Sequence, residues 1–151
     1  MDALDRKILA ELQRDGRMTL TDLADRVGLT VSPCHRRLKD LEQSGVIAGY
    51  RAVIDPGAVS LGFQTLVFVT MHAATREVIS AFEEAVTEIE AVIDAQRLFG
   101  EPDYLLRVVT RDLPHFQQVY DEHLSALPGV QRLNTTLVMR QVIDDRMLPV
   151  K

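Results

Sequence analysis

The sequence predicts an α+β chain made of two parts, because its periodic pattern changes near residue 60. Residues 2–45 contain three short segments whose apolar residues recur at helical spacing. Residues 62–139 instead show strand-like, β-branched runs and amphipathic segments in the order strand, helix, strand, twice over. We therefore expect a helical domain at residues 1–50, a linking strand or hinge at 51–61 and a mixed domain at 62–151.

The helical part contains two short helices in close succession. They follow a first amphipathic helix expected at residues 2–14. The next helix opens with Thr19, which forms a possible capping box with Asp22. The last is expected to have Ser32 as N-cap and Pro33 as its first helical residue. Two helices joined by a tight turn, the second of them basic, are typical of a helix-turn-helix, so double-stranded DNA is the first candidate partner.

The last of these helices has two different faces. At 100° per residue Cys34, Leu38 and Leu41 share one face, and Arg36 and Lys39 project from the other. Such a helix packs on one side and offers cations to DNA on the other, although the same cations also fit an ordinary solvated face. The residues that we expect at the DNA are Thr30, Ser32, His35, Arg36, Arg37, Lys39 and Arg51.

Residues 46–56 follow these helices and are rich in β-branched side chains up to Pro56. This composition indicates a wing or an exit strand. Arg51, which lies on it, fits either a phosphate contact or an exposed arginine without a function.

The net charge of −5 is unevenly distributed along the chain. Residues 1–60 hold nine Lys/Arg and nine Asp/Glu, whereas residues 61–151 hold eight and thirteen. Duplex DNA is therefore attracted only to a local basic surface, and the rest of the molecule repels it. This distribution favours a reader of particular sites over a protein that coats DNA.

Several classes of protein are disfavoured by what the sequence lacks. It has no secretory signal and no apolar run long enough to span a bilayer, so we expect a cytoplasmic protein with no membrane partner. The single cysteine, Cys34, is interpreted as a small core residue. The four histidines show no metal-ligand spacing, and we find no phosphate-binding or nucleophile motif. We therefore expect no metal, no cofactor and no enzymatic activity.

The second part predicts a ferredoxin-like βαββαβ fold. Asp112 is expected to cap its second helix, and Pro128 with Gly129 to end it. One face of the sheet stays open in this fold, and an apolar open face on so small a domain is a natural dimer surface. The expected strands are residues 63–73, 91–99, 103–110 and 130–139, and the expected helices are 76–89 and about 113–127.

One loop, residues 99–104 (FGEPDY), stands out between two strands that we expect to be central in the sheet. Gly100 allows a close backbone approach, and Pro102 stiffens the turn. Asp103 beside free backbone N–H groups offers a partner for an ammonium and donors for a carboxylate, the two groups of a free amino acid. A plain hairpin in which Asp103 only forms the turn explains the same residues.

Motifs along almost the whole chain resemble the Lrp/AsnC family, the leucine- and asparagine-responsive regulators. They are LDRKILAELQRDGR, LADRVGLTVSPCHRRLKDLEQSGVIAGYRAVIDP, FGEPDYLLRVV, LPGV and TTLVMRQV, in this order. The resemblance implies a winged helix-turn-helix, a linking strand and a C-terminal domain that dimerises and binds amino acids. It also implies assembly of dimers into octamers, with effectors between dimers, and a dimer should read an imperfect palindrome.

By position, the resemblance also implies an effector site. The loop Glu101-Pro102 departs from many relatives, so the identity of the effector stays open. The residues that match the family's effector loop and facing strand are Gly100, Asp103, Tyr104, Leu105, Thr135 and Thr136.

Two enzymes are rival interpretations. Siroheme decarboxylases resemble the same two-domain fold, with histidine and arginine residues around a tetrapyrrole. Here the helix from Ser32 keeps its outward cations, and the second half has no strong His/Arg cluster, so a regulator is favoured. A ferredoxin-like dimeric monooxygenase would need a deep apolar pocket, of which the dense Val/Leu/Phe pattern gives no sign.

Overall fold

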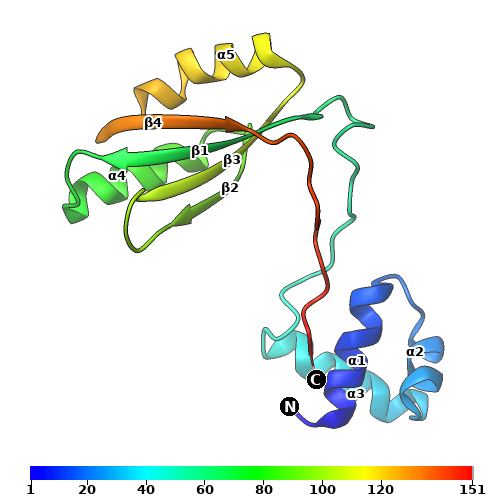
Figure 1. Cartoon of the computed structure of the whole chain (residues 1–151). Helices are drawn as coiled ribbons and strands as arrows, with labels where there is room; N and C mark the ends of the chain where they lie inside the picture. Colours follow the sequence, from blue (N-terminus) through cyan, green and yellow to red (C-terminus); the bar gives the residue numbers. More distant parts are fainter. Residues whose placement is uncertain (151) are drawn as a thin grey trace. The chain divides into compact units, whose positions relative to one another are not determined.

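The computed structural model describes residues 1–150 and divides the chain into two compact units. The first unit contains Met1–Val53 and the C-terminal segment, residues 142–150 (Figure 1). The second unit is Ile54–Gln141. This division differs from the expected one at the C-terminus, because the segment after residue 141 groups with the helical unit.

The first unit is built on three helices, α1 (Ala3–Arg14), α2 (Leu20–Val27) and α3 (Val31–Gln43). Thr19 caps α2 as predicted, since its hydroxyl accepts from the Asp22 N–H at 3.1 Å. The helices close over one small core, and the prediction that Cys34 belongs to it is confirmed. The buried members are Ile8, Leu23, Ala24, Val27, Cys34 and Leu41.

The start of α3 differs from the prediction. The helix begins at Val31 with Thr30 as N-cap, so Ser32 is not the cap and Pro33 is the third helical residue. Proline is tolerated there because the N–H groups of the first turn have no partner within the helix. Helical geometry therefore starts two residues earlier than the proline signal indicates.

The strand predicted between residues 46 and 61 is not formed in the described chain. A strand needs a neighbour with which to pair its backbone, and the sheet of the described residues does not include this segment. Its β-branched residues remain in water, with Val53 79% and Ile54 63% exposed.

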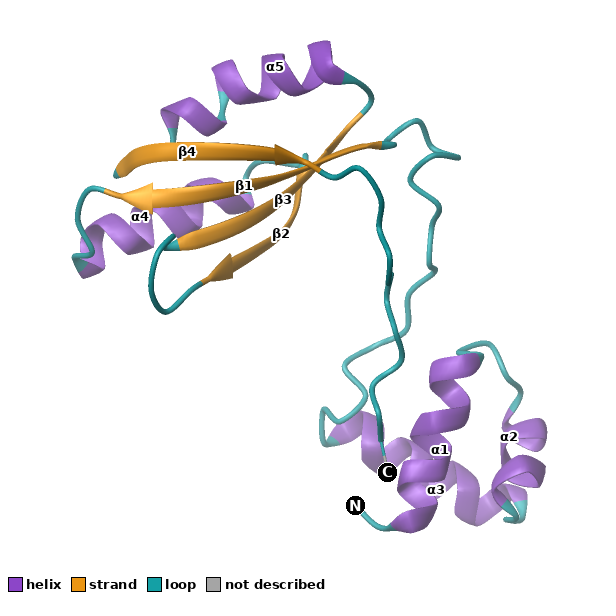
Figure 2. Cartoon of the chain, in the orientation of Figure 1, coloured by secondary structure: helices purple, strands orange, loops and turns teal. Residues whose placement is uncertain are grey.

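The second unit has the predicted βαββαβ order (Figure 2). The strands lie in the order β2-β3-β1-β4, and each neighbouring pair is antiparallel. The strands β1 and β3 are therefore central, and β2 and β4 form the edges. The elements are β1 (Phe63–Met71), α4 (Arg76–Thr87), β2 (Val92–Arg97), β3 (Tyr104–Thr110), α5 (Leu113–Glu122), a 3-10 turn (Leu124–Ala126) and β4 (Val130–Leu137).

The two faces of the sheet have different surroundings. Val67 and Val69 of β1 and Leu106 of β3 are fully buried, and they pack in one core with Phe82 of α4 and Phe116 of α5. Side chains alternate along a strand, so the intervening residues point to the opposite face. That face carries Leu66, Phe68 and Leu105, which are only partly buried and lie outside the core. We call it the open face.

The helix α5, which precedes β4, is shorter than predicted. Asp112 caps α5 as expected, with its carboxylate accepting from the His115 N–H at 2.8 Å. The helix ends at Glu122 rather than near Leu127, and the 3-10 turn follows. Gly129 then has φ +75°, a left-handed conformation that favours glycine.

Candidate nucleic-acid interface and ligand pocket

The helix α3 presents a polar stripe to solvent. Ser32, His35, Arg36 and Lys39 are all exposed, and their spacing of i, i+3, i+4 and i+7 puts them on one side of the helix. The core residue Cys34 lies on the opposite side. This stripe has two cations and two neutral hydrogen-bonding side chains, which suits both phosphates and base edges.

Arg37 departs from the role expected for it. Its Nη1 donates to the carboxylates of Asp2 and Asp5, each at 2.7 Å, and the side chain is 26% exposed. The hydrogen bonds to Asp5 and Asp2 raise the pKa of Arg37. The guanidinium is thus occupied at the N-terminus of α1, and Arg37 holds α3 against α1 instead of facing a ligand.

Two other expected DNA contacts lie outside the stripe. Thr30 is the exposed N-cap of α3 and makes no capping hydrogen bond through its side chain. Arg51 is 85% exposed, and its Nη2 lies 4.0 Å from a carboxylate oxygen of Asp145. Such a loose, solvated pair holds the arginine weakly, so its charge stays available.

A small pocket lies beside the loop between β2 and β3 and has a volume of about 100 Å³. The loop joins an edge strand to a central one, so the prediction that both strands are central is wrong for β2. Three expected effector residues line this pocket. The full lining is Met71, Ala74, Ile79, Arg97, Leu98, Phe99, Gly100, Asp103 and Tyr104.

Asp103 fastens this loop to the end of β1. Its Oδ2 accepts from the Met71 N–H at 2.7 Å, and its own N–H donates to the Val69 carbonyl at 2.9 Å. The residue is therefore a turn former, as the simpler interpretation holds. One carboxylate oxygen still has no hydrogen bond among the described residues, which leaves room for a second role.

Arg97 is a pocket residue that sequence reasoning missed. It ends β2, pairs in register with Tyr104 and lines the same pocket as Asp103. A cation and an anion thus lie in one small pocket. The available signal was a charged side chain at the last strand position before the loop, which is a weak signal because edge strands commonly carry charges.

Tyr104 forms a wall of the pocket rather than a free hydroxyl. It is 3% exposed, its ring lies 4.5 Å from that of Phe82, and its hydroxyl donates to Glu83 at 2.8 Å. Burial, followed by the hydrogen bond to Glu83, raises the pKa of Tyr104 to about 12. The hydroxyl proton of Tyr104 is therefore donated to Glu83 of α4.

The other three expected effector residues do not line this pocket. Leu105 lies opposite Phe68 on the open face, and Thr136 lies opposite Leu66 on that face. Thr135 points to the helix side and lines a different groove, between α5 and β4. Within a single chain, the expected effector residues therefore lie in separate places.

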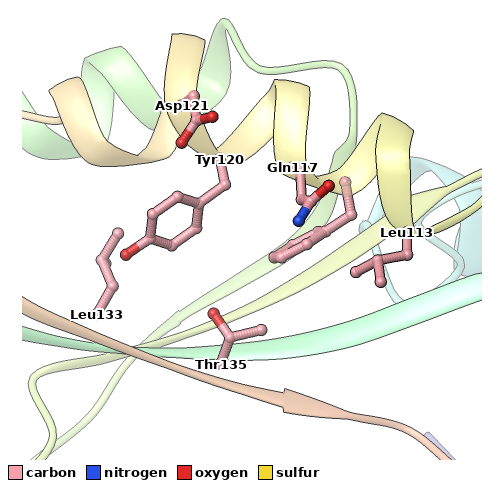
Figure 3. A pocket seen from close by; sticks show the side chains of 7 residues that line it. Leu113, Gln117, Tyr120, Asp121, Leu133 and Thr135 are labelled. Carbon is pink, nitrogen blue, oxygen red and sulfur yellow. The ribbon is translucent and has the colours of Figure 1, made fainter.

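The groove between α5 and β4 is the larger cavity, with a volume of about 660 Å³. Figure 3 shows Tyr120 reaching from α5 toward β4, and Leu133 and Thr135 rising from β4 toward the helix. No sequence motif indicated this groove, because its residues are spread over a helix and an edge strand. The lining is Leu113, Phe116, Gln117, Tyr120, Asp121, Leu133 and Thr135.

Within residues 1–150, no three His, Cys, Asp or Glu side chains are grouped so that they could hold a metal ion. None of the helices of this part of the chain has the length and hydropathy needed to cross a bilayer.

Comparison with known proteins decides the family. The profile of a winged helix-turn-helix DNA-binding domain matches residues 1–48, and that of the Lrp/AsnC ligand binding domain matches residues 64–148. The chain belongs to the Lrp/AsnC family. It is a transcriptional regulator with a DNA-binding domain and a ligand-binding domain, and the predicted fold class is confirmed.

Similar proteins cover nearly all of this regulator. The DNA-binding transcriptional activator DecR of Escherichia coli is 34% identical over 100% of this chain and 99% of its own length. A leucine-responsive regulatory protein of Rhizobium meliloti is 39% identical over 95% and 92%. The crystal structure of a Neisseria meningitidis transcriptional regulator in complex with L-Met is 35% identical, covers 99% and 96%, and has a TM-score of 0.93.

Proposed function

We propose that this regulator reads specific DNA sites with the exposed stripe of α3 and that an amino acid bound beside Gly100 changes this binding. The observation that carries the proposal is the pocket in which Arg97 and Asp103 both lie. Such a pair of opposite charges complements the carboxylate and the ammonium of a free amino acid. The L-Met complex of the Neisseria relative supports this class of ligand.

On the DNA side, Arg36 and Lys39 supply the charge. Their side chains project from the face of α3 that the core leaves free, so they are the candidates for bidentate contacts to guanine. Ser32 and His35 hydrogen-bond beside them, and Thr30 and Arg51 contact phosphates that fix the register.

On the ligand side, Asp103 has two tasks. One oxygen keeps the loop on β1 through the Met71 N–H, and the other accepts from the ligand's ammonium. Arg97, together with backbone N–H groups of the Gly100 loop, binds the carboxylate. Tyr104 and Met71 close the inner wall against which the ligand's side chain packs.

A second copy of the chain completes the site. A volume of about 100 Å³ is well below the ~300–1,000 Å³ of common ligand pockets. Leu105, Thr135 and Thr136 lie elsewhere on the same chain, so they can contribute only through a neighbouring copy. We propose a homodimer through the open face and further assembly of dimers, up to an octamer, in which these residues meet the loop.

The open face has unpaired polar groups that support such a dimer. Gln64 Oε1 and Arg107 Nε are buried yet have no hydrogen-bond partner among residues 1–150. By register, both lie on the face of Leu66 and Phe68. Buried groups of this kind are normally satisfied, and a second sheet packed here supplies partners for them.

The DNA-binding proposal is tested by selection from a pool of random duplexes. We expect enrichment of an imperfect palindrome with half-sites ~34 Å apart, or a multiple of that spacing, because a dimer places two α3 helices on one side of the duplex. Retention of the whole pool with equal affinity would contradict sequence-specific reading.

The ligand proposal is tested by thermal shift against the common amino acids, with L-methionine first. A ligand at 100 times its Kd stabilises the folded protein by about 2.7 kcal/mol. Two analogues sharpen the assay, one that lacks the carboxylate and one that lacks the ammonium. We expect both to lose the shift, and a full shift with either analogue would remove Arg97 or Asp103 from the site.

The rival enzyme is tested with siroheme. Since the relatives are named as regulators and the proposal contains no catalytic step, we expect no Soret band after incubation and gel filtration. A coloured, stoichiometric complex would favour the decarboxylase.

A further inference from the structure

The C-terminal segment returns to the DNA-binding unit after the sheet ends. The last ladder contact of β4 is the Val138 N–H, which donates to the Gln64 carbonyl at 3.0 Å. Residues 142–150 then group with the first unit. The backbone therefore passes between the two units twice, once before β1 and once after β4.

Gln13 in the last turn of α1 holds this segment by both ends of its carboxamide. The Leu148 N–H donates to Gln13 Oε1 at 2.6 Å, and Gln13 Nε2 donates to the Leu148 carbonyl at 3.2 Å. A primary amide thus pairs with a backbone amide as a strand would. The second link, from Asp145 to Arg51, is loose at 4.0 Å.

The apolar side chains of the segment are only partly covered. Val142 is 85% and Leu148 72% exposed, and Ile143 and Met147 are about half exposed. Two hydrogen bonds in contact with water are individually weak. The two hydrogen bonds of Gln13 therefore contribute a measurable share of what holds the segment on α1.

The helix that carries Gln13 also supports α3. At its other end, Asp2 and Asp5 bind Arg37 of α3, and between the two ends Ile8 is completely buried in the shared core. A displacement of the last turn of α1 therefore moves the same helix that contacts Arg37 of α3.

We propose that residues 142–150 are a latch, docked on Gln13, that carries the state of β4 in the ligand-binding unit to α1 and so to the DNA-reading helix. The latch rests on the proposed function only for the signal that it carries. Its docking is a property of the chain alone, so the two parts are tested separately.

Docking is tested by trypsin cleavage after Arg146, beside Leu148, in the full-length protein. Cleavage of a segment that opens and closes rapidly follows the population of its open form. We expect Gln13→Ala to increase the rate of this cleavage about tenfold, because both hydrogen bonds are lost. Cleavage after Arg140, which precedes the latch, should not change.

Two further variants serve as controls. Gln13→Glu keeps an acceptor for the Leu148 N–H but loses the donor, so it should give an intermediate rate. Gln43→Ala removes an exposed glutamine from the end of α3 and should leave the rate unchanged. Equal rates in wild type and Gln13→Ala would overturn the latch.

The signal is tested by the effect of L-methionine on DNA affinity. We expect Gln13→Ala to bind both L-methionine and DNA but to lose most of the change in DNA affinity that the wild type shows. A full response in Gln13→Ala would overturn the relay. Absence of a response in the wild type would instead count against the proposed function, and the cleavage result would stand.

Discussion

The two units differ in how many structural elements supply their candidate functional residues. In the DNA-binding unit, Ser32, His35, Arg36 and Lys39 lie on one face of one helix and are exposed together. In the ligand-binding unit, the pocket takes its residues from the strands β1, β2 and β3, the β2–β3 loop, Ala74 and α4, and the expected residues of β4 lie elsewhere. The candidate residues of one unit thus share a single face, whereas those of the other lie in separate places on one chain.

This difference follows from what each ligand demands. A duplex accepts a convex helix in its major groove, so a face set by helical periodicity is enough. A small ligand must be enclosed, and the pocket beside Gly100, at about 100 Å³, is too small to enclose one by itself. Completion by a second copy is the alternative.

The largest effect is expected from Phe68→Glu on the open face. Burial of an unpaired charge costs ~3–5 kcal/mol, so the dimer should dissociate at least about 100-fold more readily in sedimentation experiments. Ligand binding should be lost with the dimer, whereas affinity for an isolated half-site should persist.

Leu113→Glu is the matched control, because it puts the same charge at the start of α5 in the groove and away from the open face. It should leave the dimer intact. Dissociation by Leu113→Glu but not by Phe68→Glu would move the dimer interface to the groove.

The next prediction compares the cost in stability of a Gly→Ala substitution in each of the two units. A Cβ at Gly129 would lie 2.2 Å from Val78 Cγ1, and its φ is +75°. Strain and overpacking together should cost ~2–4 kcal/mol in Gly129→Ala. Gly28 has φ +76° but nothing within 4 Å of a Cβ, so Gly28→Ala should cost only the ~1–2 kcal/mol of the left-handed backbone. Calorimetry on both variants checks the ratio.

The difference between local and long-range contacts explains what could be predicted from the sequence. Helical stripes, the caps at Thr19 and Asp112 and the βαββαβ order depend on local periodicity and short-range hydrogen bonds, and all of them were predicted. The hydrogen bonds of Arg37 to Asp2 and Asp5 were not predicted, because these partners are distant in sequence.

The ligand pocket was harder to predict for a similar reason. Gly100 and Asp103 were found from the loop alone, but Arg97 becomes a partner only through the pairing of β2 with β3. The docking of residues 142–150 on Gln13 leaves no trace in periodicity, since it joins positions 135 residues apart.

A smaller effect is expected from Arg36→Ala and Lys39→Ala. A contact to a guanine edge should cost ~1–3 kcal/mol and should relax the sequence preference at one base position. Arg17→Ala removes an exposed cation outside α3 and serves as the control. Unchanged anisotropy titrations for the double variant would take α3 out of the reading role.

The smallest effect concerns pH. The backbone hydrogen bond from Asp5, followed by the side-chain hydrogen bond from Arg37, lowers the pKa of Asp2 below 3.8. The lowered pKa stabilises the fold at pH above 3.8, and this contribution disappears as the pH falls through the lowered value. Asp2→Asn keeps an N-cap, so its Tm should lie slightly below wild type at pH 7 and converge with it as the pH falls through the lowered pKa of Asp2. A constant difference would contradict the charge argument.

The most direct test of the account is the response of DNA binding to L-methionine in Asp103→Asn. Asparagine keeps an oxygen for the Met71 N–H but removes the charge that binds the ammonium. Ligand affinity should fall by ~1.5–3 kcal/mol, about 10- to 100-fold, while DNA affinity without ligand stays within twofold of wild type. Equal responses of wild type and variant across an L-methionine titration would place the effector away from Asp103 and leave this residue as a turn former.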